Sequence, residues 1–173
     1  MKTDETSRAV DALRTAILVI NPAGRTAEEA AQTREAVADW LRGESWTIVH
    51  ASIVACDSAE LSRAFESLSA PVEAIVVCGA TGLGAEDIAP QTLERLCDFA
   101  VPGIGEMLRA ESLKYSRKAY LSRCGGYVSK GRLVLSIPGN PKAAVEQLGI
   151  LRELLPNAIR SVRGHCKSRS EKP

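Results

Sequence analysis

A glycine-rich loop and two aspartates are the residues of this sequence whose types and spacing could do chemistry. The loop reads GATGLG over residues 79–84, and Asp87 follows it closely. Successive backbone N–H groups in such a loop can point at an anion, and the Thr81 hydroxyl adds a further donor. The loop has neither the lysine of a Walker A loop nor the spacing of a dinucleotide fingerprint. The residues therefore leave two interpretations open, an anion site and a plain turn.

The two aspartates, Asp57 and Asp87, each follow a segment that we expect to be a strand. A carboxylate beside a phosphate loop is suited to hold Mg²⁺, because this hard cation prefers oxygen ligands. Each aspartate could instead cap the next helix, and the spacing from Asp57 to Glu60 resembles a capping box. Because both would lie past the ends of parallel strands, they could meet across one crevice.

The stretch SIPGNPKA, residues 136–143, is a second candidate ligand loop. Backbone N–H groups at a helix N-terminus could receive a phosphate or the edge of a base, and Lys142 could add a point charge. A tight Pro-Gly turn, followed by a helix that begins at Asn140 and Pro141, accounts for the same residues without a ligand.

The elements that must position these residues follow from the apolar pattern. Short apolar runs predict strands over 16–20, 46–54 and 73–78, and helical spacing predicts helices over 27–42 and 56–68. This alternation is typical of an α/β protein with a mostly parallel sheet and helices on both faces. Ligands in such sheets bind beyond the carboxyl ends of the strands, which is where the glycine loop would lie.

The second half of the chain is less regular. The sequence predicts a short helical stretch from Pro90 that includes Phe99, and another over 103–113. It also predicts strands over 119–123 and 132–137, joined by the loop CGGYVSKG. A helix should then begin at Asn140.

Composition limits the class of protein. The 173 residues suit one domain, 45 % are hydrophobic, and the net charge of +1 argues against a nucleic-acid partner. No apolar run is long enough to span a bilayer, and the polar, mixed-charge start does not resemble a signal peptide. Five cysteines without a C-x-x-C argue against a disulfide framework and a structural zinc site. We expect a cytoplasmic protein that binds neither membranes nor nucleic acid.

Three separated stretches carry a family resemblance. They are CGATGLGAEDIAP (78–90), SLKYSRKAYLSRCGGY (112–127) and LSIPGNPKAAVE (135–146). Together and in this order they resemble the MogA/MoaB family of molybdenum cofactor biosynthesis, which also occurs as the G domain of gephyrin. The likeness extends over residues 15–164 as one molybdopterin-binding domain, between polar segments at 1–14 and 165–173.

The resemblance implies a three-layer α/β/α sandwich that is usually a homotrimer. Catalytic members of the family adenylylate molybdopterin with Mg-ATP and release pyrophosphate, so molybdopterin and ATP are the implied substrates, and other cofactor-synthesis proteins are possible partners. Asp57 and Asp87 match the acids expected to hold Mg²⁺ or to align the attacking phosphate. The positions that match the nucleotide side are Gly79, Thr81, Gly82, Pro138, Gly139 and Pro141. Those that match the pterin side are Ser112, Lys114, Ser122 and Arg123.

Several positions depart from the family pattern, and most of them fall in the implied pocket. Ala80 replaces a glycine, Glu86 an arginine, and Ala89 a threonine; Asn21 stands in place of an acid and Arg34 in place of a glycine. Two functional alternatives follow. The chain is an active adenylyltransferase, or it has kept the fold and lost the chemistry. In the second case it would bind a pterin or nucleotide, or serve as an assembly partner in cofactor synthesis.

Overall fold

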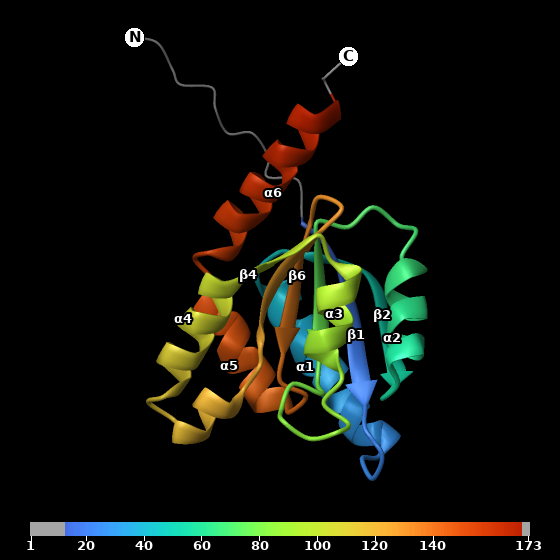
Figure 1. Ribbon diagram of the computed structural model, residues 1–173, viewed down its shortest axis with the longest axis vertical. Coiled ribbons are helices and arrows are strands. Elements are labelled where there is room, and N and C mark those ends of the chain that lie inside the picture. The colour runs from blue at the N-terminus through green and yellow to red at the C-terminus, as the bar shows by residue number, and fades with distance from the viewer. Residues whose placement is uncertain (1–12, 171–173) are drawn as a thin grey trace.

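The computed structural model describes residues 13–170, which form a six-stranded sheet with helices on both faces (Figure 1). The strands are Arg14–Asn21 (β1), Thr47–Ala55 (β2), Ala74–Cys78 (β3), Phe99–Val101 (β4), Gly125–Ser129 (β5) and Arg132–Ile137 (β6). The helices are Ala27–Gly43 (α1), Ser58–Glu66 (α2), Ala89–Leu96 (α3), Pro102–Ser112 (α4), the 3₁₀ helix Arg117–Leu121 (η1), Pro141–Leu151 (α5) and Leu155–Ser170 (α6).

The sheet has the strand order β2-β1-β3-β6-β5-β4. The four strands β2, β1, β3 and β6 are parallel, whereas β5 is antiparallel to both of its neighbours. In this register Cys78 is paired with Val19 of β1 and with Ile137 of β6. The parallel strands therefore end at one edge of the sheet, and the predicted α/β architecture with its mostly parallel sheet is confirmed.

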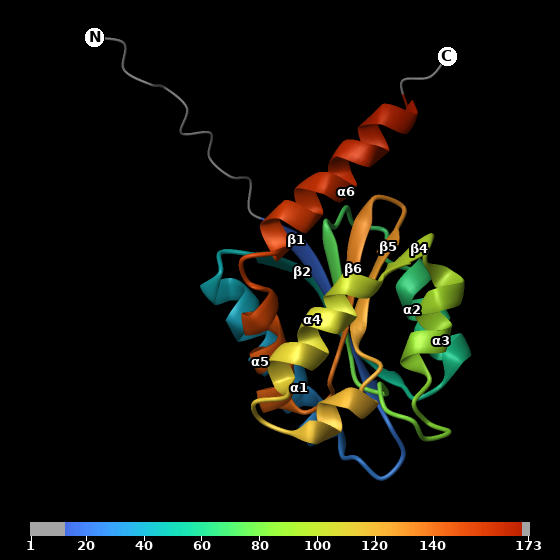
Figure 2. The ribbon, with the colours of Figure 1, turned by 60° about the vertical axis from the view of Figure 1, so that its left-hand side comes forward.

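Each central strand contributes side chains to two separate cores, because successive side chains point to opposite faces. On β1, Ile17 and Val19 lie in the core beneath α1, α4, α5 and α6, while Leu18 and Ile20 lie in the core beneath α2 and α3. Figure 2 shows the two groups of helices on opposite sides of the sheet. Burial on both faces explains why these strands read as continuous apolar runs.

The predicted strand at residues 119–123 is wrong. These residues belong largely to η1, and the strand that pairs with β6 is β5, within the segment that we expected to be a loop. The adjacent glycines of GGYVS argued against a strand, but tertiary packing requires one of them. A Cβ on Gly126 would collide with Ile104 of α4, so the glycine lets this helix pack directly on the sheet.

The helical stretch predicted from Pro90 ends sooner than expected. Helix α3 ends at Leu96, and Phe99 begins the edge strand β4, which pairs antiparallel with β5. The Phe99 side chain is 59 % exposed, so it does not belong to the apolar face of a helix. Helical spacing in the sequence could not distinguish these two arrangements, because the pairing partner lies in β5.

The ends of the chain fall partly outside the described residues. Helix α6 continues through Ser170 and extends beyond the end of the sheet (Figures 1 and 2), whereas most of the polar segment 1–14 is not described. Among the helices that the structure describes, none combines the length and apolar character needed to span a bilayer. The cysteines at 56, 78, 97 and 124 are free thiols.

Candidate functional site

The glycine loop leaves β3 at the carboxyl edge of the sheet through two residues with left-handed backbone. Gly79 has φ 104° and Ala80 has φ 54°, and the Gly79 N–H donates to the carbonyl of Ile137 at 2.9 Å. A Cβ on Gly79 would lie 3.0 Å from the Ile20 carbonyl oxygen and 3.6 Å from Gly139 Cα. Position 79 therefore requires glycine for its backbone conformation and for the close approach of two neighbouring chain segments.

Asp87 folds back onto this loop. Its Oδ2 accepts the backbone N–H of Gly84 at 2.8 Å, and a Cβ on Gly82 would lie 2.6 Å from the same oxygen. Helix α3 has Ile88 as its N-cap, without a side-chain cap bond. Asp87 is therefore not the helix cap that its position in the sequence allowed; it closes the glycine loop instead.

Arg123 also holds the glycine loop in place, through hydrogen bonds to its backbone. Its Nε donates to Gly82 O at 2.7 Å, Nη1 to Gln91 Oε1 at 2.9 Å and Nη2 to Asp87 O at 2.6 Å. Its backbone N–H also donates to the Thr81 carbonyl at 2.9 Å. The side chain that the family resemblance placed on the pterin side thus holds the backbone of the glycine loop, and fixes its shape.

Asp57 is the N-cap of α2. Its Oδ1 accepts the backbone N–H groups of Ala59 at 2.8 Å and Glu60 at 2.9 Å, so the capping interpretation is confirmed. The Glu60 side chain pairs with Arg63, which leaves the reciprocal half of the expected capping box unformed.

The two aspartates share one region of the carboxyl edge. Cys56 precedes Asp57, and its thiol donates at 3.0 Å to the carbonyl of Glu86, the residue before Asp87. Burial raises the pKa of the Cys56 thiol, and the carboxylates of Glu86, Asp87 and Asp57 raise it further. The hydrogen bond from Cys56, next to Asp57, to Glu86, next to Asp87, brings together the two chain segments that carry the aspartates.

These carboxylates fit a cation that is shared with a substrate better than a closed metal cage. Asp57 Oδ2 and Asp87 Oδ1 accept no hydrogen bond from the described residues. Within the same part of the chain, no group of three or more His, Cys, Asp or Glu side chains is arranged to hold a metal. Mg²⁺ commonly uses one or two carboxylates and completes its shell with water and substrate phosphates, a pattern that these two oxygens suit.

The second candidate loop crosses the first at its glycine. Asn140 caps α5 by accepting the Ala143 N–H at 3.1 Å, and Pro141 is the first residue of that helix, as expected. The Gly139 carbonyl accepts the Thr33 hydroxyl of α1 at 2.6 Å. A Cβ on Gly139 would lie 3.1 Å from Gly79 Cα, so the two loops touch backbone to backbone.

Arg25 is the cationic residue that sequence reasoning missed. Its Nη2 donates to the Thr33 hydroxyl at 2.7 Å and to the Glu29 carbonyl at 2.8 Å. Its Nη1 would lie 3.0 Å from a Cβ on Gly139, which places the guanidinium beside the crossing of the two loops. Only the turn composition around Arg25 was visible in the sequence, because its neighbours come from α1 and the segment after β6.

The remaining pterin-side positions lie at the end of α4 and beyond η1. Lys114 Nζ pairs with Glu111 at 3.2 Å, and the Ser122 hydroxyl accepts the Cys124 N–H at 3.2 Å. No hydrogen bond or ion pair between described residues joins the side chain of Ser112 or Lys114 to the glycine loop. Ser122 is instead adjacent to Arg123, and so comes close to the loop through its neighbour.

The residues that depart from the family pattern have different surroundings. Ala89 is fully buried against Ala80, so its small side chain fills core space. Asn21 Oδ1 is buried and accepts no hydrogen bond from the described residues. Glu86 is exposed, and Arg34 pairs with its neighbour Glu35 on α1.

Comparison with known proteins identifies the family. The model of a probable molybdopterin binding domain matches residues 16–157. A molybdenum cofactor biosynthesis bifunctional protein of Synechococcus elongatus is 33 % identical over 84 % of this chain and 47 % of its own length. A molybdopterin adenylyltransferase of Helicobacter pylori is 34 % identical over 57 % of this chain and 56 % of its own length. The chain thus spans about half the length of the curated relatives it matches.

Solved structures agree with this match. The molybdopterin biosynthesis enzyme MoaB of Thermus thermophilus superposes with a TM-score of 0.79 at 28 % identity, covering 88 % of this chain and 97 % of that one. A tungsten cofactor synthesizing protein MoaB from Pyrococcus furiosus, at 22 % identity and a TM-score of 0.76, covers 90 % of this chain and 99 % of that one and shares the fold. Because the family model spans most of the sequence and includes both crossing loops, this chain belongs to the family of probable molybdopterin binding domains.

Proposed function

We propose that this protein acts in molybdenum cofactor biosynthesis by adenylylating molybdopterin with Mg-ATP. The observation that carries the proposal is the crossing of Gly79 and Gly139 at the carboxyl edge of the sheet, with the braced loop 79–87 and two acids beside it. The named activity of the Helicobacter pylori relative gives the reaction class.

The reaction requires an oxygen of the terminal phosphate of molybdopterin to attack the α-phosphorus of ATP. The new P–O bond forms as the bond to the β-phosphate breaks, and pyrophosphate leaves. Catalysis of such a transfer depends mainly on positioning and on neutralising charge. Backbone N–H groups of Gly79, Thr81 and Gly82 would face the phosphates, and the segment 138–141 would border the nucleotide.

The charged residues around this loop would have different roles. Asp87 and Asp57 would hold Mg²⁺, which supplies neutralisation of phosphate charge when it is bound. Arg25, beside the loop crossing, would add a fixed positive charge. Arg123 is a positioning residue, since its guanidinium holds the loop at Gly82 and Asp87 and also bonds to Gln91 of α3. Ser112, Lys114 and Ser122 would lie on the pterin side.

The proposal is tested by incubating the purified protein with molybdopterin, ATP and Mg²⁺. Adenylylated pterin, measured by mass spectrometry, and pyrophosphate, measured by a coupled assay, should appear in equal amounts. A matched sample with EDTA should form neither product. If a folded sample loaded with pterin gives no product above background, the catalytic proposal fails.

A specific observation supports a second candidate, a family member that binds ligands without catalysis. Glu86 places a carboxylate where the family has an arginine, and the buried Asn21 replaces an acid. Such a protein would bind the pterin or nucleotide, or would assist other cofactor-synthesis proteins. Calorimetric titration with ATP and with molybdopterin separates these cases: binding without turnover supports the ligand-binding role, and no binding leaves only a role as an assembly partner.

We also propose that the functional unit is a homotrimer. The exposed apolar side chains Phe99, Tyr120 and Leu121, each more than half exposed, are suited to contacts between subunits. Size-exclusion chromatography with light scattering should give three times the mass of the 18.5 kDa chain. A monomer at micromolar concentration would contradict this part of the proposal.

A further inference from the structure

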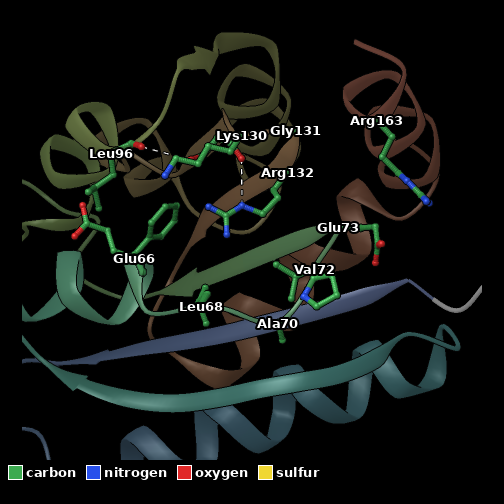
Figure 3. Close-up of a pocket in the computed structure, with 13 residues that line it drawn as sticks. Glu66, Leu68, Ala70, Val72, Glu73, Leu96, Lys130, Gly131, Arg132 and Arg163 are labelled. Carbon is green, nitrogen blue, oxygen red and sulfur yellow. Dashed lines mark hydrogen bonds between the residues drawn. The ribbon is translucent and has the colours of Figure 1, made fainter. Parts of the chain in front are cut away.

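A cleft of about 510 Å³ lies at the edge of the sheet opposite the glycine loop. Figure 3 shows the residues that line it. It is bordered by the end of α2, the segment leading into β3, the end of α3, the β5–β6 turn and α6. Its apolar side chains include Phe65, Leu68, Val72 and Leu96. The volume is within the range of small-molecule sites in proteins, which run from about 300 to about 1,000 Å³.

Arg132 provides an uncompensated positive charge in this cleft. Its Nε donates to the Ser129 carbonyl at 3.2 Å, and its guanidinium lies 5.5 Å from the centre of the Phe65 ring. Within the described residues no carboxylate forms an ion pair with it, and its two Nη atoms have no protein acceptor. Burial lowers the pKa of Arg132, which reflects the desolvation of a charge without a close counter-ion, although Asp98 opposes this shift.

The nearby charges leave the cleft basic. Lys130 and Arg163 also line it, and Figure 3 shows Lys130 beside Arg132. Lys130 occupies a two-residue turn with Gly131, with φ values of 50° and 75°, which fixes it at the mouth of the cleft.

The two acids that line the cleft do little to offset this charge. Glu73 Oε1 pairs with Arg14 Nη2 at 2.6 Å, and its Oε2 accepts the Arg14 backbone N–H at 2.8 Å. Glu66 is exposed at the rim. The interior of the cleft therefore offers a guanidinium over an aromatic ring, a nearby lysine and apolar walls.

We propose that this cleft binds a small organic anion, a carboxylate or phosphate monoester that carries an apolar body. The anion would lie on the Nη atoms of Arg132 with Lys130 nearby, because a guanidinium binds such groups through two parallel hydrogen bonds. The apolar body would pack on Val72 and Leu96. This ligand is separate from the substrates of the carboxyl edge, since the two sites lie at opposite ends of the parallel strands.

The test uses phenyl phosphate, benzoate and uncharged benzyl alcohol as probes, each titrated into ¹⁵N-labelled full-length protein. Backbone resonances of residues 65–72 and 129–132 should shift with the two anions, and those of 79–87 should not. The relative affinities of phenyl phosphate and benzoate show whether the site prefers phosphate or carboxylate. Benzyl alcohol should bind at least about tenfold more weakly, since it lacks the charge-assisted hydrogen bonds.

Variants of Arg132 test whether its guanidinium binds the anion. Arg132→Gln should weaken anion binding by about tenfold or more, and Arg132→Lys should have a smaller effect because the charge is kept. Arg160→Gln, on the exposed surface of α6, is the matched control and should bind like the original protein. Thermal unfolding of each variant verifies that it is folded.

Three outcomes would overturn the inference. They are the absence of shifts at millimolar anion, shifts confined to residues 79–87, and equal binding of benzyl alcohol. If Arg132→Gln does not fold, Lys130→Gln and Arg132→Lys provide the same comparison, and unchanged affinity in both would also reject the site.

Discussion

The two edges of the sheet use their arginines in opposite ways. At the carboxyl edge, Arg123 gives its side-chain donors to Gly82, Gln91 and Asp87, so its charge is used to hold backbone. At the other edge, Arg132 donates from Nε to the Ser129 carbonyl, and neither of its Nη atoms has an acceptor in the part of the chain that the structure describes. The difference indicates that the first edge presents a preorganised loop backbone, which we propose faces the phosphates, whereas the second edge presents the arginine side chain itself.

The largest expected effect is on turnover at the carboxyl edge. Asp87→Asn keeps an oxygen that can accept the Gly84 N–H but removes the negative charge, so turnover should fall about a hundredfold or more. The melting temperature should hardly change. Adenylylation rate and thermal unfolding measure the two quantities, with Asp57→Asn as a partner variant, since asparagine caps a helix nearly as well as aspartate. A destabilised Asp87→Asn with full turnover would show that Asp87 is purely structural.

Removing the Arg123 guanidinium should affect both turnover and the local order of the glycine loop. Arg123→Gln removes most of the bonds to Gly82, Gln91 and Asp87, so the free energy of unfolding should fall by about 2 kcal/mol. Turnover should fall more than about tenfold, because the loop is no longer held in place. Hydrogen exchange should accelerate in residues 82–88. Arg117→Gln, at an exposed position of η1, is the control. Equal hydrogen exchange in both variants would argue that Arg123 does not hold the loop in place.

At the opposite edge, Glu73 should make the stability of the protein depend on pH. Burial would raise the pKa of Glu73, but its hydrogen bonds with Arg14 outweigh burial and lower the pKa below 4.5. The folded pKa is thus below the unfolded one, so this stabilisation is present above the unfolded pKa and is lost as pH falls through the folded pKa. Glu73→Gln should reduce the free energy of unfolding at neutral pH by about 1–2 kcal/mol and flatten its loss in acid.

Chemical denaturation at a series of pH values measures this dependence. Glu66→Gln, an exposed change at the rim of the same cleft, should leave the pH profile unchanged. If Glu73→Gln keeps the full acid dependence of the original protein, other carboxylates are responsible for it.

The smallest effect concerns the departure at position 80. Ala80 has φ 54°, a conformation that glycine adopts more easily, so Ala80→Gly should raise the free energy of unfolding by about 1 kcal/mol or less. Ala85→Gly, in the same loop without a positive φ, should bring no such gain. Denaturant unfolding distinguishes the pair. A loss of stability in Ala80→Gly would mean that the alanine methyl contributes more through packing than its backbone strain costs.

Local patterns predicted some parts of the site well. The cap at Asp57 and the helix start at Asn140 and Pro141 depend on residues adjacent in sequence, and both were correct. The capping alternative left open for Asp87 does not hold, because its carboxylate accepts the Gly84 N–H instead. The functional roles of these residues stay predictions.

The sequence by itself determined the alternation of strands and helices through Leu151, apart from the strands between Phe99 and Ser129. It also determined the edge at which the glycine loop lies. Periodicity and turn residues are sufficient for this because they act within a few positions. Only the tertiary structure decided that Gly126 belongs to a strand, that Arg123 binds the loop, and that Arg132 lies in a cleft without an ion-pair partner among residues 13–170. In each case the residues that decide the structural role are distant in sequence. Their packing and charge environment can therefore be recognised only in the folded chain.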